Sequence, residues 1–170
     1  MERRVIEVTK ELESAAVIRF QDCDPFGHLN NARYIDYFLN ARQDQVAEHY
    51  GLQFFERGKQ ESWVATKMQL AFLSPAVLME RVLIRTRLIE ATDSTLVVES
   101  VMLDQEAERL KAIAWAEFSY VSLLTGKRAT HTAELTQLFR SVVVDEAFDK
   151  DGFNRRVEAL KAHFRRPPGQ

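Results

Sequence analysis

The segment over residues 21–31, which reads Gln-Asp-Cys-Asp-Pro-Phe-Gly-His-Leu-Asn-Asn, holds the densest group of polar residues in the sequence. A stretch without Pro or Gly follows it, and this stretch is predicted to be helical. The first backbone N–H groups of a helix lack intrahelical partners and lie at its positive end, so they stabilise anions. A carboxylate beside such donors can attack a polarised carbonyl or activate water against it. The segment therefore indicates an acyl-transfer or anion-binding site.

Asp24 is the carboxylate that the local pattern favours. In an extended segment Asp22 and Asp24 share one face, while Cys23 faces away. Pro25 biases Asp24 toward an extended backbone, and Gly27 permits a tight reversal that leaves Asp24 near the start of the helix. We expect Asp22 to hydrogen-bond locally at the end of the strand. We expect Cys23 to be a small buried hydrophobe and not a nucleophile.

Three further residues of the segment have expected roles. His28 either orients the carboxylate or the water, acts as the acid, or is a loop histidine that the backbone satisfies. Asn30 is expected to be the N-cap of the helix. Asn31 is expected to offer its backbone N–H, not its side chain, to a substrate.

The rest of the chain must position this segment. A helix is predicted over 31–50, ended by Gly51, and its wide apolar surface predicts that it is mostly enclosed. Ala112, Ala114 and Ala116 lie on one face of a predicted strand and leave room for that helix. Period-two patterns and turn residues predict four strands, over 64–72, 82–89, 96–103 and 110–123, and a short strand is predicted over 16–20. Further helices are predicted over 133–144 and 149–166.

These elements predict an α+β fold, in which one long helix packs on a five-stranded antiparallel sheet. The free edges and apolar surface of such a sheet favour association into dimers.

Composition limits the other possibilities. The chain has 170 residues, with 23 Lys and Arg against 25 Asp and Glu, which predicts one domain and argues against nucleic acid as the main partner. Its single cysteine excludes a disulfide framework. No run of about 18 apolar residues and no secretion signal at the first residues is found. A cytoplasmic protein that does not enter a membrane is therefore expected.

The stretch over 20–34, Phe-Gln-Asp-Cys-Asp-Pro-Phe-Gly-His-Leu-Asn-Asn-Ala-Arg-Tyr, resembles the signature of hotdog-fold thioesterases of the 4-hydroxybenzoyl-CoA thioesterase-like family. It is also similar to the Asp…His-Val-Asn-Asn…Lys-Tyr-Ile stretch of plant acyl-ACP thioesterases. With the Leu-Thr-Gly-Lys ending at 124–127, the resemblance covers about residues 12–140. It implies a hotdog thioesterase domain over 1–144, with 145–170 as a C-terminal helical extension of the same domain.

The resemblance also implies an activity and its residues. An acyl-CoA thioesterase of fatty acid metabolism is expected, with Asp24 as nucleophile or general base, His28 as a second catalytic residue and the Asn31 backbone N–H polarising the thioester carbonyl. The residues expected against the substrate are Phe26, Gly27 and Tyr34. The site is expected at the interface of a homodimer or homotetramer, without a metal or redox cofactor.

Other readings of the same residues remain open. An acyl-ACP thioesterase, a hotdog dehydratase and a non-catalytic acyl-CoA-binding module are the alternatives. Phe26 stands where acyl-ACP enzymes have an asparagine, and the turn over 90–94 lacks the arginines with which some aromatic-CoA thioesterases bind the CoA phosphates.

Overall fold

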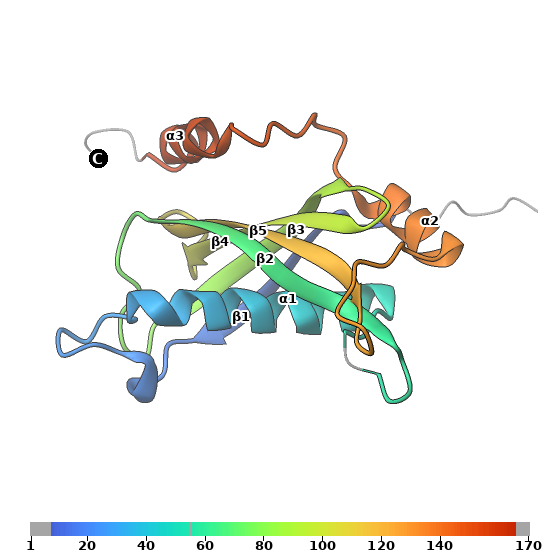
Figure 1. Ribbon diagram of the computed structural model, residues 1–170. Helices are drawn as coiled ribbons and strands as arrows, with labels where there is room; N and C mark the ends of the chain where they lie inside the picture. The colour runs from blue at the N-terminus through green and yellow to red at the C-terminus, as the bar shows by residue number, and fades with distance from the viewer. Residues whose placement is uncertain (1–7, 55, 166–170) are drawn as a thin grey trace, which may run out of the picture.

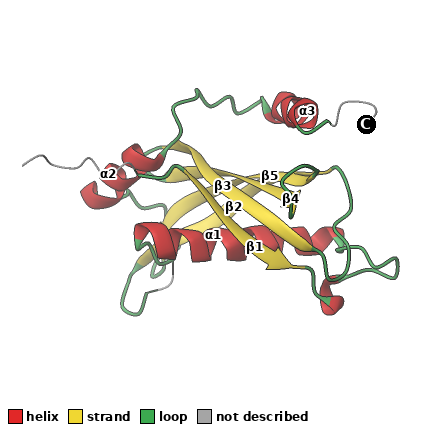
Figure 2. Ribbon diagram, turned by 180° about the vertical axis from the view of Figure 1, so that it is seen from behind, coloured by secondary structure: helices red, strands yellow, loops and turns green. Residues whose placement is uncertain are grey.

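The computed structural model describes residues 8–54 and 56–165. Its centre is a five-stranded antiparallel sheet with the strand order β1-β3-β4-β5-β2. Helix α1 (Tyr34–Tyr50) lies along one face of the sheet, helix α3 (Phe153–His163) lies over the other, and α2 (Ala133–Val142) lies at one end (Figures 1 and 2). The strands are β1 (Glu11–Val17), β2 (Glu61–Phe72), β3 (Arg81–Ala91), β4 (Thr95–Asp104) and β5 (Leu110–Ser122). The predicted α+β arrangement of one long helix on a five-stranded antiparallel sheet is confirmed.

The predicted elements differ from the observed ones mainly at their ends. The prediction of a strand over 16–20 is wrong, because β1 ends at Val17 and Phe20–Asp22 forms a 3-10 turn. The long helix also begins later than predicted: residues 31–33 form a second 3-10 turn, and α1 starts at Tyr34. Gly51 does end α1, with φ +64° and its N–H donated to the carbonyl oxygens of the last turn.

The core between α1 and the sheet forms as the small-residue face predicted. Phe38 and Ala41 of α1 belong to the same buried cluster as Ala112 and Ala114 of β5. The prediction that α1 is mostly enclosed is wrong for the single chain, in which the outward side of the helix, residues 43–44 among others, is exposed. Helix α1 packs against the sheet with one side only, so its other side stays exposed in the single chain although the helix is rich in apolar residues.

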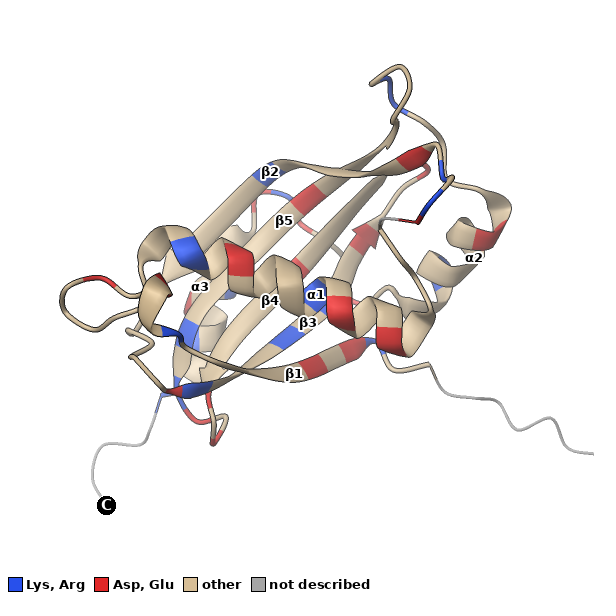
Figure 3. Cartoon of the chain, turned by 90° about the horizontal axis from the view of Figure 1, so that it is seen from below, with Lys and Arg blue, Asp and Glu red and all other residues tan. Residues whose placement is uncertain are grey.

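Strand β2 is an edge strand with an irregular pattern. A bulge between Ala65 and Lys67 shifts its register against β5, so the predicted alternation does not hold through the whole strand. Residues 64–67 are exposed, and Val64 is 42% accessible. The opposite edge, β1, carries the exposed residues Glu11 and Glu13 near its start (Figure 3).

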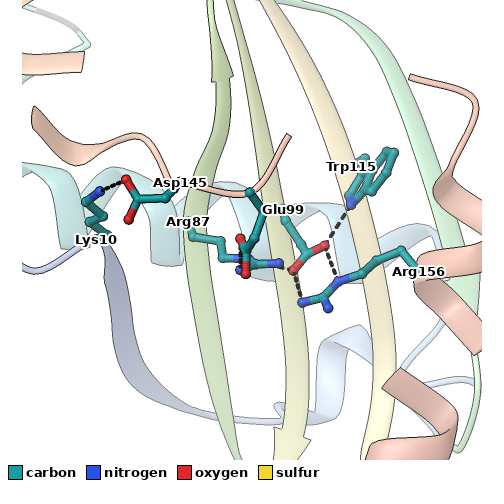
Figure 4. Close-up of polar contacts among 7 residues, drawn as sticks. Lys10, Arg87, Glu99, Trp115, Asp145 and Arg156 are labelled. Atoms are coloured by element: carbon teal, nitrogen blue, oxygen red, sulfur yellow. Dashed lines mark hydrogen bonds and ion pairs between the residues drawn. The ribbon is translucent and has the colours of Figure 1, made fainter. Parts of the chain in front are cut away.

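The face of the sheet under α3 holds a buried carboxylate. Glu99 is only 2% exposed, and it accepts hydrogen bonds from Arg87 Nε at 2.9 Å and from Arg156 Nη2 at 2.8 Å. Arg156 Nε and Trp115 Nε1 donate to its other oxygen, both at 2.9 Å (Figure 4). Burial alone would raise the pKa of Glu99, but the hydrogen bonds from Arg156 and the charge of Arg87 outweigh it and hold the pKa below its ordinary value.

Helix α3 shares a core with the sheet. Phe153 packs edge to face on Trp115, with ring centroids 5.4 Å apart, and both belong to one buried cluster. The division of the domain at residue 144 stays a prediction, and residues 1–7 and 166–170, at the two ends of the predicted units, lie outside the described chain. In the described part, no helix is both long and apolar enough to cross a membrane.

Glu99→Gln is expected to lower the free energy of unfolding by about 1–3 kcal/mol at neutral pH, because hydrogen bonds to a buried charge are lost. A carboxyl with a depressed pKa in the folded state stabilises above its unfolded pKa of about 4.3, and that stabilisation is lost as the pH falls through the folded value. Urea unfolding across an acidic pH series should therefore show a smaller loss of stability with falling pH in E99Q than in the unsubstituted chain.

The control is Asp145→Asn, which removes an exposed ion pair with Lys10. Its effect should stay within about 0.5 kcal/mol, because exposed pairs contribute little. Equal pH profiles for E99Q and the unsubstituted chain would contradict the role given to Glu99.

Candidate active site

The polar segment folds as a narrow hairpin-like loop in front of α1. The Asp24 N–H donates to the His28 carbonyl oxygen at 2.8 Å, and the Asn30 N–H donates to the Asp22 carbonyl oxygen at 2.9 Å. Gly27 makes the reversal with φ +75°, a conformation that other residues adopt at a cost. The predicted reversal at Gly27 is confirmed, and it folds residues 22–24 back along residues 28–30.

Two backbone donors fix the carboxylate of Asp24. Its Oδ1 accepts from the Phe26 N–H at 2.9 Å and from the His28 N–H at 3.1 Å. The side chain is half-buried, and its second oxygen makes no hydrogen bond to any described residue. One oxygen therefore sets the orientation of the group, and the other is available to a reactant.

The neighbours of Asp24 have structural partners of their own. Asp22 Oδ2 accepts from the Tyr37 hydroxyl at 2.9 Å, a partner in α1 and not the local one expected. Cys23 packs against the core cluster, and its thiol donates to the Arg19 carbonyl oxygen at 3.4 Å. Burial and then the charges of Asp22 and Asp24 raise the pKa of the Cys23 thiol, which opposes a role as nucleophile.

His28 meets Asp24 through its backbone and not through its ring. The imidazole is half-buried beside Phe26, with ring centroids 6.3 Å apart, and makes no hydrogen bond to a described residue. Phe26 itself is 84% exposed. The loop thus presents an aromatic ring and an unengaged imidazole at the surface of the single chain.

The start of the helix offers an unengaged donor. Asn30 Oδ1 accepts from the Ala32 N–H at 3.0 Å, so Asn30 is a cap as predicted, although of the 3-10 turn that leads into α1. Asn31 is exposed, and its N–H makes no hydrogen bond within the described chain. This N–H is one of the orphan donors of the turn.

A second loop, over residues 74–80, supports the first. The Leu29 N–H donates to the Ala76 carbonyl oxygen at 2.8 Å, and the Leu78 N–H donates to the Gly27 carbonyl oxygen at 2.9 Å. The Tyr34 hydroxyl accepts from the Ala76 N–H at 3.2 Å. Because Tyr34 is only 2% exposed, it joins the helix to this loop from within the core.

The second loop is anchored in turn to β5. Lys111 is buried, and its Nζ lies 2.6 Å from Glu80 Oε1 and donates to the Pro75 carbonyl oxygen at 2.9 Å. The loop that holds Asp24 is therefore hydrogen-bonded to the loop over 74–80, and that second loop is bound to the sheet through Lys111.

Buried polar residues on α1 were missed by the sequence reasoning. Arg42 is 7% exposed, and its Nη1 donates to Thr86 Oγ1 at 3.0 Å. Thr86 Oγ1 donates to Gln45 Oε1 at 2.5 Å, and Gln45 Nε2 donates to Ser14 Oγ at 2.8 Å. Burial lowers the pKa of Arg42 to about 10. The burial of Arg42 could have been inferred from its position in the helix, because it follows the core residue Phe38 by four residues and so lies on the same buried face.

Comparisons with known proteins agree with this architecture. The family model of the thioesterase-like superfamily matches residues 18–160. A search of curated protein sequences finds no match.

Among solved structures, a 1,4-dihydroxy-2-naphthoyl-CoA thioesterase from Synechocystis superposes with a TM-score of 0.69 at 13% identity, over 78% of this chain and 95% of that one. The DHNA-CoA thioesterase from Staphylococcus aureus gives 0.69 at 14% identity, over 92% and 97%. The protein TT1821 from Thermus thermophilus gives 0.71 at 20% identity, over 79% and 99%. At these identities the likeness shows the shared fold. The family model matches most of the length of this chain. The match and the shared fold together show that the chain belongs to the thioesterase-like superfamily and is a hotdog-fold thioester hydrolase.

Proposed function

We propose that the chain is an acyl-CoA thioesterase, which hydrolyses an acyl-CoA thioester to a free acid and CoA. The observation that carries the proposal is the Asp24 carboxylate, which two backbone N–H groups hold by one oxygen while the other stays without a partner in the described chain. Fixed geometry of this kind lowers the barrier, because the reacting group needs no reorientation.

The chemistry follows one of two routes. As general base, Asp24 takes a proton from water, the resulting hydroxide adds to the carbonyl carbon, and the C–S bond breaks with release of the CoA thiolate, which is then protonated. As nucleophile, Asp24 adds to the carbonyl carbon itself, the same C–S bond breaks, and water hydrolyses the mixed anhydride that remains. A thioester is reactive enough that one carboxylate and one N–H donor suffice in either route.

The Asn31 N–H supplies the second part of the site in this proposal. The carbonyl oxygen gains negative charge as either nucleophile adds, and an orphan N–H at the entry of a helix stabilises that charge. Phe26 and Gly27, at the tip of the loop, are proposed to contact the substrate, and the unengaged His28 ring to contact the water or the leaving group. Tyr34 is proposed to act through the loop that it holds.

A second copy of the chain is proposed to complete the site. The edge of β2 carries charge at Glu61 and Lys67, but Val64, Ala65 and Thr66 between them are exposed and uncharged, and an unpaired stretch of this kind is a template for another strand. Pairing of two β2 edges about a two-fold axis would cover the outward side of α1. In this proposal the enzyme is a homo-oligomer that acts on fatty acyl-CoA in the cytoplasm.

Asp24→Asn should lower thioester hydrolysis by at least about 10²–10³-fold, because the amide is neither a base nor a nucleophile while its oxygen can keep both loop hydrogen bonds. Release of free CoA thiol measures the rate. Asp22→Asn is the matched control, since Asp22 is bound to Tyr37, and it should retain most of the activity. Near-normal hydrolysis by D24N would overturn the role of Asp24.

Asn31→Pro tests the backbone donor. Proline suits the first position of a helical turn, and the extended conformation of Asn30, with ψ 134°, suits the residue before a proline. We expect a loss of about 10²–10³-fold in kcat with an unchanged melting temperature, whereas Asn31→Ala, which keeps the N–H, should remain active. Equal activity of the two variants would exclude the Asn31 N–H as the polarising donor.

Thr66→Pro tests the proposed interface. Thr66 lies at the bulge and has no Cα partner in the ladder with β5, so a proline there costs the 3.3 Å hydrogen bond from its hydroxyl to the Glu117 carbonyl oxygen and blocks addition of a strand at the edge. Analytical ultracentrifugation should show a shift from dimer to monomer, with activity falling in parallel. Glu11→Pro, at the first residue of β1, should leave the assembly intact, and a dimeric T66P would show that β2 is not the interface.

A further inference from the structure

We infer that Arg42 is a specificity-determining residue, which binds a carboxylate at the far end of the acyl group. The substrate class would be acyl-CoA thioesters that carry an ω-carboxylate. The inference rests on the proposed acyl-CoA thioesterase activity and names the acyl group that it prefers.

The first observation is that the Arg42 guanidinium is buried without a charged partner. Nine-tenths of the residue is shielded from solvent, and no carboxylate of the described chain lies within ion-pair distance of it. Within the part of the chain that the structure describes, its one hydrogen bond goes to the neutral hydroxyl of Thr86, at 3.0 Å. A guanidinium has five N–H donors, so most of its capacity is unused.

The second observation is that a cavity of about 200 Å³ opens beside this guanidinium. No side-chain nitrogen or oxygen that is sealed from solvent in the described chain lacks a hydrogen-bond partner, so the unused Arg42 donors border accessible space. Arg42 lines this cavity and a second, much smaller one of about 20 Å³. Together with Arg42, the larger cavity is lined by Leu39, Gln43, Phe54, Trp63, Ala65 and Phe118. A mainly apolar wall with one convergent charged group is the usual form of a ligand subsite.

The wall of the cavity is held rigidly. Trp63 Nε1 donates to His131 Nε2 at 3.0 Å, and His131 Nδ1 lies 3.1 Å from the Thr92 carbonyl oxygen. An indole N–H can only donate, so His131 is the neutral tautomer with its proton on Nδ1. Phe54 packs edge to face on Trp63, with ring centroids 5.7 Å apart.

The physical argument concerns the cost of an isolated charge. A buried cation without a counter-ion is unfavourable, and a purely aliphatic acyl chain in this cavity would leave that cost in place. A carboxylate would offset it, and the planar fork of arginine binds a carboxylate through two parallel hydrogen bonds. The apolar walls would at the same time accept the methylene groups of the acyl chain.

The cavity lies where the proposed dimer would bring the thioester. It borders Trp63 and Ala65 in the first half of β2, whereas Phe72 at the other end of β2 packs on Tyr34 at the start of α1, with ring centroids 5.1 Å apart. Antiparallel pairing of two β2 edges would place the Phe72 end of one copy beside the Trp63 end of the other. The acyl group would then extend from the Asp24 loop of one copy into the Arg42 cavity of the second.

The test compares kcat/KM for ω-carboxy and methyl-ended acyl-CoAs of equal chain length, over a series of lengths. The unsubstituted enzyme should prefer the ω-carboxy member at its best length. Arg42→Met should lower the ratio of the two kcat/KM values by about 10- to 100-fold, the value of a hydrogen bond to a charged group, through a lower kcat/KM for the ω-carboxy member. Arg42→Lys should keep part of the preference, and Arg140→Met, at an exposed arginine of α2, should leave the ratio unchanged.

The outcomes separate this inference from the proposed function. If methyl-ended acyl-CoAs are hydrolysed but neither the unsubstituted enzyme nor R42M distinguishes the two series, the Arg42 inference is overturned and the thioesterase proposal stands. If no acyl-CoA is hydrolysed, the proposed function fails, and a straight-chain dicarboxylate that raises the melting temperature of the unsubstituted protein but not of R42M would still support the Arg42 subsite. A dicarboxylate that acts no better than the matching diamide would overturn it. Should R42M fail to fold, the test uses the unsubstituted enzyme and R42K. A preference for the ω-carboxy series that is reduced in R42K supports the inference, and no preference in either protein overturns it.

Discussion

The site depends on one arrangement, in which the backbone N–H groups of Phe26 and His28 both donate to the same oxygen of Asp24. Those donors are in place because Gly27 reverses the chain with a positive φ. The reversal is held from outside by the loop over 74–80, which is joined to α1 through Tyr34 and to β5 through Lys111. A carboxylate on an exposed loop thereby gains the rigidity of the sheet, which a reacting group requires.

The sheet itself separates two kinds of buried charge. On the side of α3, Glu99 is saturated by two arginines and a tryptophan, and this arrangement joins the C-terminal helix to the fold. On the side of α1, the Thr86 hydroxyl is the only hydrogen-bond partner of Arg42 among residues 8–54 and 56–165. The first charge is compensated within the chain, so its role is structural. The charge of Arg42 is not compensated in this way, and it lies beside a cavity. We therefore assign it a role in binding a ligand.

Much of the architecture could be predicted from the sequence, because periodicity and breakers report local physics. The alternation in β3, Gly51 at the end of α1 and the alanine face of β5 each determine an element or a contact directly. The alternation predicted for the half-buried strand over 96–103 does not hold, because β4 is buried on both of its faces, between α1 and α3. The 3-10 turn at Phe20–Asp22 could not be predicted, because its own hydrogen bonds are short-range ones with no sequence signature, while bonds to distant residues hold the chain around it: the Ile18 N–H donates to the Glu80 carbonyl oxygen and the Tyr37 hydroxyl donates to Asp22. Arg42 was missed for a related reason: its apolar surroundings come from β2, β5 and the segment before β2, which only the fold brings together.

The central claim concerns the position of a thioester carbonyl relative to Asp24 and Asn31, so a crystal structure with a non-hydrolysable ketone analogue of an acyl-CoA tests it most directly. The account predicts the free oxygen of Asp24 at about 3–3.5 Å from the carbonyl carbon, a near-attack distance. It predicts the Asn31 nitrogen at about 2.7–3.1 Å from the carbonyl oxygen. A carbonyl bound elsewhere, with Asp24 engaged only by its own loop, would contradict the account.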